Sequence, residues 1–212
     1  MSFFGITDFS LFCLAVLLLN ATPGPDTAYI VGRSAAQGRD AGLVSALGIS
    51  LGCCIHSIAS ALGLSAILAT SATAFTLVKL AGGAYLIYIG LHMMFAGSNG
   101  SSQAHAAPAA RPLKTVFWQA VATNILNPKV VLFFLSFFPQ FVRADASQKT
   151  AAFLLLGAAF VTITTLWNSG TALLAGTLAR RAGRSPRVKL WLERTVGAAF
   201  VALGFKLALT KH

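Results

Sequence analysis

The chain carries the phrase Asn20-Ala-Thr-Pro-Gly-Pro-Asp26 near its start and a related phrase, Asn124-Ile-Leu-Asn-Pro-Lys129, in its second half. Both phrases lie at the edge of strongly apolar stretches. Proline removes a backbone donor and glycine loosens the backbone, so an apolar helix interrupted here leaves backbone groups without helical partners. At membrane depth such groups must face protein, water or a ligand. The two phrases therefore predict two helix breaks that build one site.

The composition indicates an integral membrane protein. Of the 212 residues, 56% are hydrophobic and 10% are charged, and the mean hydropathy is +0.75, whereas soluble domains carry about 25% charged residues. The net charge of +11 comes from short basic clusters between apolar runs. This distribution is typical of membrane loops rather than of a nucleic-acid-binding face. We expect the lipid bilayer, and no nucleic acid, as a partner.

Six apolar runs are long enough to span a membrane, which takes about 20 residues each. They cover residues 4–22, 42–69, 72–96, 116–142, 150–179 and 190–209. The first break lies at the end of the first run, and the second break lies inside the fourth run. Little sequence remains outside these runs, so we predict an all-α protein with one transmembrane domain over residues 1–212.

The loop charges predict the orientation. The loops after the first, third and fifth spans contain nine basic residues: Arg33, Arg39, Arg111, Lys114, Arg180, Arg181, Arg184, Arg187 and Lys189. The opposite side has only Arg143, Lys149 and Lys211. Because Lys and Arg concentrate in cytoplasmic loops, we expect the first set to be cytoplasmic and both termini to be periplasmic.

We expect the two halves of the chain to be related. Residues 97–114 form a low-complexity tract that reads as a flexible cytoplasmic linker between repeat one (about 1–96) and repeat two (about 115–212). Lys79-Leu-Ala-Gly-Gly-Ala-Tyr85 in the first half resembles Arg194-Thr-Val-Gly-Ala-Ala-Phe200 in the second, although small residues also recur in any packed membrane helix. Three spans per half predict a 3+3 inverted repeat, an architecture typical of transporters.

Four sequence blocks carry a family resemblance. They are the first Asn/Pro phrase, the glycine-rich Ala46-Leu-Gly48-Ile-Ser-Leu-Gly52, the Lys79–Tyr85 block with Gly90, and Asn127-Pro-Lys129 followed by Phe133-Phe134 and Phe138-Pro-Gln-Phe-Val142. In this order they resemble the LysE/RhtB family of bacterial amino-acid exporters, and in particular its RhtB-like branch. The resemblance implies efflux of amino acids across the bacterial inner membrane, driven by proton antiport with alternating access.

Nine residues of the two phrases are candidate substrate-binding residues: Asn20, Pro23, Gly24, Pro25, Asp26, Asn124, Asn127, Pro128 and Lys129. Half-helices that begin at Pro25 and Pro128 would offer their N–H groups and positive dipole ends to a carboxylate. Asp26 and Lys129 would add opposite charges for a zwitterion. The alternative is that both prolines only kink spanning helices.

Asp26 and His56 are candidates for proton coupling. An acid inside a membrane protein is a functional candidate, and histidine titrates near physiological pH. Asp26 could instead be a water-exposed acid at the start of a helix near the cytoplasm. His56 could instead form an interhelical hydrogen bond.

Small residues and one cation are candidates for packing or gating. Gly48 and Gly52 form a Gly-x-x-x-Gly step that permits close helix contact, within the monomer or in a homo-oligomer. Gly82, Gly83 and Tyr85 belong to the repeated block of the third span. Lys79 can pair with an acid or extend to the membrane interface.

The chain has only five acids, so it lacks the anionic lining that would select a dication such as lysine. The small polar surroundings of Asn20, Thr22, Asn124 and Asn168 suit homoserine, threonine or a small aliphatic amino acid. Two alternatives are a thiol–disulfide electron carrier and a membrane scaffold without transport activity. The first is disfavoured because Cys13, Cys53 and Cys54 all lie in one half. No enzyme activity, cofactor or metal site is expected.

Overall fold

The computed structural model describes residues 3–70 and 110–182, together with residues 73, 84, 87, 88, 91, 198 and 201. Its elements are η1 (Phe3–Gly5), α1 (Phe9–Ala21), α2 (Pro25–Gln37), α3 (Arg39–Thr70), α5 (Leu113–Ile125), α6 (Pro128–Phe137), η2 (Phe138–Phe141) and α7 (Lys149–Ala182). The described part is helical, and its only β pairing is an isolated bridge between Ile6 and Val142. The predicted all-α fold is confirmed.

Both predicted helix breaks are present. The axes of α1 and α2 are bent by 53°, and those of α5 and α6 by 51°. Each new helix begins with a proline, Pro25 or Pro128. Proline is tolerated at this first position because the N–H that it lacks has no partner within the helix. The same local chemistry therefore breaks both helices.

The first predicted span, residues 4–22, contains α1, but the helical chain continues beyond it. Helix α2 extends to Gln37, and the bent pair together is long and apolar enough to cross a membrane. Gly38, at φ 89°, ends α2 in a conformation that favours glycine. Arg33 is consequently not a loop residue: it lies within α2 and is 5% exposed.

The other described helices agree with the predicted spans. Helices α3 and α7 are each long and apolar enough to cross a membrane, and each bent pair adds one more span if it is counted as one. The predicted spans 42–69, 116–142 and 150–179 correspond to α3, the α5–α6 pair with η2, and α7. Spans 72–96 and 190–209, with the Lys79 and Arg194 blocks and most of the linker, lie outside the described residues.

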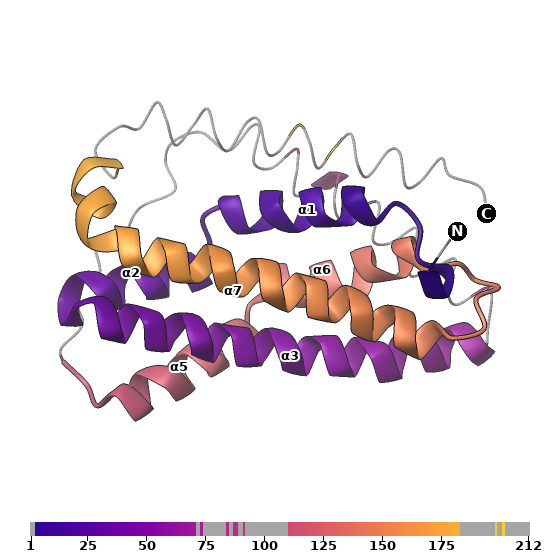
Figure 1. Cartoon of the computed structure of the whole chain (residues 1–212), viewed down its shortest axis with the longest axis horizontal. Helices are drawn as coiled ribbons and strands as arrows, with labels where there is room; N and C mark the ends of the chain where they lie inside the picture. Colours follow the sequence, from indigo (N-terminus) through magenta and orange to yellow (C-terminus); the bar gives the residue numbers. More distant parts are fainter. Residues whose placement is uncertain are drawn as a thin grey trace.

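The two halves repeat the same order of elements in opposite directions. Each described half contains a bent helix pair followed by a long helix. In Figure 1, α3 runs from left to right and α7 runs back from right to left. Of all described helix pairs, these two share the most extensive contact. This is the arrangement that an inverted repeat requires.

The end of the bundle near Arg143 is closed by aromatic side chains. Phe12 of α1 packs edge-on against Phe138 and Phe141, with ring centroids 5.3 Å apart in both pairs. The rings of Phe133 and Phe137 are 4.5 Å apart. The backbone pairs here too, because Thr7 N donates to Phe141 O at 2.9 Å. The interior next to this end is therefore filled with packed aromatic rings.

Candidate functional site

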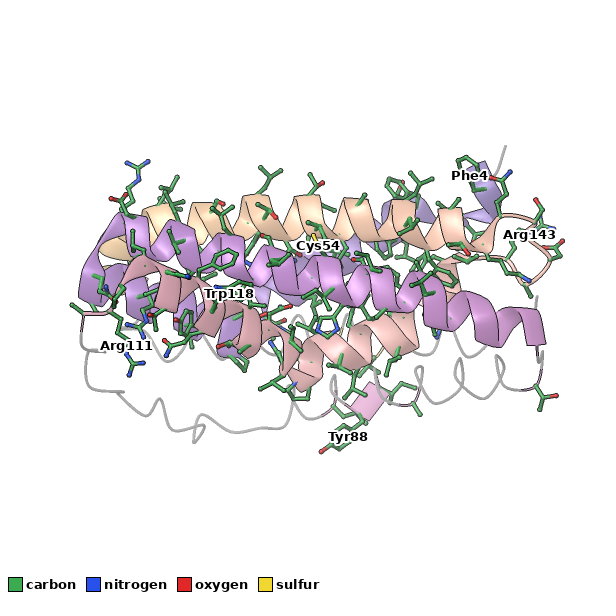
Figure 2. The ribbon with its side chains drawn as sticks, turned by 90° about the horizontal axis from the view of Figure 1, so that it is seen from below. Phe4, Cys54, Tyr88, Arg111, Trp118 and Arg143 are labelled. Carbon is green, nitrogen blue, oxygen red and sulfur yellow. The ribbon has the colours of Figure 1, made fainter. Side chains whose placement is uncertain are left out.

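The two helix breaks meet around one small cavity. It is lined by Leu19, Asn20, Thr22, Gly24, Asp26, Thr27, Cys53, Asn124, Asn127, Lys129, Val130, Phe160, Thr164 and Asn168. Its volume is about 30 Å³, well below the roughly 300–1,000 Å³ of typical ligand pockets. Figure 2 shows Cys54, the sequence neighbour of the lining residue Cys53, between Arg111 at one end of the bundle and Arg143 at the other. The cavity is therefore small and lies between the two ends of the bundle.

Asn124 connects the two halves at this cavity. It is 0% exposed, and its Nδ2 donates to Asp26 Oδ2 at 2.7 Å. Its Oδ1 accepts a weak bond from Cys53 Sγ at 3.7 Å. A residue from the second break thus holds the acid of the first break in place.

Asp26 retains a free acceptor. The side chain of Asn127 lies beside its carboxylate, but Oδ1 is buried without a well-formed hydrogen bond from the described residues. A buried carboxylate oxygen without a donor is costly. The first turn of α2 also has no side-chain cap, since its N-cap residue is Gly24. This side of the cavity can therefore bind a hydrogen-bond donor at Asp26 Oδ1 and a carboxylate at the start of α2.

Lys129 binds the carbonyl groups at the end of α1, on the N-terminal side of the first break. Its Nζ donates to Leu19 O at 2.7 Å and to Thr22 O at 2.8 Å. These carbonyls lie at the C-terminal end of α1, where they lack helical donors and where the helix dipole favours a cation. The only ion pair within 4.0 Å among the described residues joins Arg143 and Asp145, so Lys129 and Asp26 share the cavity without direct contact.

Asn20 and Asn127 have local roles at the breaks. Asn20 Nδ2 donates to Val16 O at 2.8 Å and to Thr164 Oγ1 at 3.1 Å, which joins α1 to α7. Asn127 is the N-cap of α6, and its Oδ1 accepts from Lys129 N at 3.1 Å. Substitution of such an N-cap residue by alanine typically costs about 1 kcal/mol.

His56 lies next to this group on α3. Its Nε2 is 3.4 Å from Asn124 O, and its ring stacks on Phe134 with centroids 5.5 Å apart. His56 is not among the residues that line the cavity. One residue, Asn124, therefore separates it from Asp26.

Gly48 and Gly52 bring α3 against α5 within one chain. A Cβ at Gly52 would lie 2.8 Å from Asn124 Cβ, and a Cβ at Gly48 would lie 2.7 Å from Ala120 Cβ. Carbon atoms cannot approach so closely, so both positions require glycine at the present helix separation. Gly52 thereby makes room for Asn124.

Several predicted site residues lie elsewhere. Pro23, Pro25 and Pro128 are exposed and do not line the cavity, because they shape the breaks through the backbone. Lys79, Gly82, Gly83 and Tyr85 lie outside the described residues.

Sequence reasoning missed Thr27, Cys53, Phe160 and Thr164 as lining residues. Thr164 and Asn168 are four residues apart on α7 and therefore share one face. That spacing of two polar residues in an apolar helix was a usable signal. Within the described residues, no group of three His, Cys, Asp or Glu side chains could hold a metal ion.

The sequence matches the family described as LysE type translocator over residues 17–211. It is 33% identical over 207 residues to an uncharacterized membrane protein of Pseudomonas aeruginosa, with 96% of each chain covered. It is 26% identical over 208 residues to a leucine efflux protein of Klebsiella pneumoniae, covering 97% of this chain and 96% of the other. A leucine efflux protein of Enterobacter sp. is 24% identical over 205 residues, with 97% of each chain covered. No solved structure matches.

Proposed function

This chain belongs to the LysE type translocator family, and on that basis we propose that it exports neutral amino acids across the bacterial inner membrane by proton antiport. The observation that carries the proposal is the small cavity between two broken helices from opposite halves, with the bonded pair Asp26 and Asn124 in its lining. Inverted-repeat transporters place their substrates between broken helices in this way.

The free groups of the cavity suit a zwitterion. Asp26 Oδ1 lacks a donor, and the ammonium group of an amino acid can supply one. The uncapped N–H groups at the start of α2 can receive the carboxylate, which the helix dipole favours there. We assign substrate binding to these two features rather than to Lys129, since its ammonium group already binds two carbonyls of α1.

The side chain of the substrate is proposed to be neutral and apolar. Asp26 and Lys129 balance each other in charge, so a second positive charge in the substrate would be uncompensated. Leu19, Val130 and Phe160 supply an apolar side to the cavity. The leucine efflux relatives favour leucine or a similar aliphatic amino acid over homoserine and threonine.

Competition at Asp26 offers a route to antiport. A proton and a substrate ammonium group can each neutralise the same carboxylate, so binding of one disfavours the other. His56 lies one residue away, with its Nε2 3.4 Å from Asn124 O, and can pass protons towards Asp26 through water. The cavity must then open alternately to the two sides of the membrane.

Reconstituted protein tests the proposal directly. Liposomes containing the purified chain should release labelled leucine faster than labelled lysine, and a pH gradient should drive the release. Asp26→Asn should abolish release, while Asp40→Asn, at the exposed first turn of α3, should retain it. If no neutral amino acid is released by the unmodified protein, the proposed function is wrong.

A further inference from the structure

A row of polar contacts leads from the cavity to one end of the bundle between α2 and α5. Tyr29 Oη is 3.0 Å from Val116 O and 3.2 Å from Gln119 Oε1. Arg33 Nη2 donates to Gln119 Oε1 at 3.0 Å. Gln37 Nε2 donates to Arg111 O at 2.8 Å. We call these side chains of α2 and their partners the α2–α5 seam.

The seam begins at the cavity itself. Asp26, Tyr29, Arg33 and Gln37 are spaced three or four residues apart, so they lie on one face of α2. Asp26 bonds Asn124 in the cavity, and Gln37 bonds Arg111, which Figure 2 shows at the end of the bundle. The seam therefore connects the cavity with the end of the molecule where α3 and α5 begin.

Water can replace the contacts of the seam at low cost. Helices α2 and α5 contact each other less than either contacts α3, so side-chain hydrogen bonds supply much of their association. Each bond between neutral side chains contributes only about 0.5–1.5 kcal/mol, and each bond of the charged Arg33 about 1.5–3 kcal/mol, because water offers an equivalent partner. At the opposite end, separation would expose the rings of Phe12, Phe137 and Phe138 to water. The seam is the easier place to open.

Arg33 is the charged centre of the seam. Its guanidinium carbon lies 5.4 Å from the centre of the Tyr29 ring, and Nη1 donates to Gln37 Oε1 at 2.7 Å. The side chain is 5% exposed, so its guanidinium group lies inside the bundle. Any molecule that passes between α2 and α5 must pass a fixed positive charge.

We propose that the α2–α5 seam is the gate through which the amino acid enters from the cytoplasm, and that Arg33 excludes substrates with a cationic side chain. This inference rests on the proposed export function. The substrate carboxylate takes the place of the glutamine oxygens on the guanidinium, where two parallel hydrogen bonds are possible. A second positive charge on the substrate is repelled at the same point.

Cross-linking tests the gate. In the double variant Gln37→Cys/Arg111→Cys, a short bifunctional thiosulfonate should stop leucine release from liposomes, and a reducing agent should restore it. Each single variant keeps the three native cysteines, so each reports any effect of the reagent on those thiols, and its release should not change when the reagent is added. Full release from protein shown to be cross-linked would overturn the gate.

Substitution of Arg33 tests the charge filter. Arg33→Gln should raise the ratio of lysine to leucine release at least tenfold, while Arg33→Lys should keep the ratio of the unmodified protein. An unchanged ratio in Arg33→Gln would refute the filter, and so would a loss of exclusion in Arg33→Lys. If Arg33→Gln is not recovered folded, Gln119→Glu should raise the ratio by placing an anion beside Arg33, and an unchanged ratio there would also refute it. Failure of the unmodified protein to release leucine would instead count against the proposed function.

Discussion

The Lys129 ammonium group joins the two halves of the molecule at a single point. It comes from the first turn of α6, and its two acceptors, Leu19 O and Thr22 O, belong to the end of α1. Helix carbonyls at a break inside a membrane protein need donors from the protein, from a ligand or from water in a cavity. Lys129, from the second half of the chain, therefore supplies the donors that the carbonyls at the break in the first half lack.

Replacement of Lys129 should destabilise the fold. Lys129→Met removes two charge-assisted hydrogen bonds and leaves two carbonyls without donors, for an expected loss of about 2 kcal/mol. At roughly 2–4 °C per kcal/mol for a chain of this size, the melting temperature in detergent should fall by several degrees. Lys114→Met, at an exposed position of α5, is the matched control and should leave it unchanged. Equal melting temperatures for the two variants would show that the bonds of Lys129 do not stabilise the fold.

Helix α3 controls the position of the site through its glycines. Gly48 and Gly52 face α5 at a distance that excludes any Cβ, and Gly52 lies directly against Asn124. Because Asn124 holds Asp26, the spacing between α3 and α5 decides the geometry of the acid on α2. A packing position is thereby linked to the proposed substrate site.

Two glycine substitutions on α3 separate this effect from helix propensity. Gly52→Ala should push Asn124 away and lower leucine transport by tenfold or more, because its Cβ would overlap that side chain. Gly63→Ala places a Cβ where no atom lies within 4 Å, and it should retain transport and stabilise the helix slightly. The measurement is initial efflux rate per amount of folded protein. Similar rates for both variants would contradict the role of Gly52.

At the scale of the described bundle, polar side chains close one end and aromatic side chains close the other. The α2–α5 seam lies at the end with Arg111, and the phenylalanine cluster lies at the end with Arg143. Alternating access requires each end to open in turn while the other stays closed. Because one end is polar and the other is aromatic, we expect the free energy of opening to differ between the two ends.

The membrane orientation is a further prediction for the whole molecule. With Arg33 assigned to α2, basic residues still concentrate at the end with Arg39, Arg111 and Lys114, so that end should face the cytoplasm. Alkaline phosphatase fused to either terminus should then be active, because it folds only in the oxidising periplasm. A cytosolic fluorescent reporter at the same positions should stay dark. The reverse pattern at both termini would place the seam at the periplasmic end and contradict its proposed position at the cytoplasmic end.

Local chemistry made the fold class and the two breaks predictable. A proline removes its own N–H wherever it occurs, so the starts of α2 and α6 at Pro25 and Pro128 could be anticipated from the sequence. The apolar run lengths likewise predicted α3, the α5–α6 pair and α7. The resemblance to the exporter family is confirmed by the family match over residues 17–211.

The partners across the site depended on the tertiary structure. Sequence reasoning treated Asp26 and Lys129 as two ligands for one zwitterion and Arg33 as a loop charge. Folding placed Lys129 on the carbonyls of α1, Asp26 on Asn124, and Arg33 in the seam with Gln119, and these partners could not be read from the sequence. These contacts join residues 86 to 110 positions apart in the chain. The sequence by itself determined where the helices break, because that is a property of single residues, while only the packing of distant segments decided which charges meet.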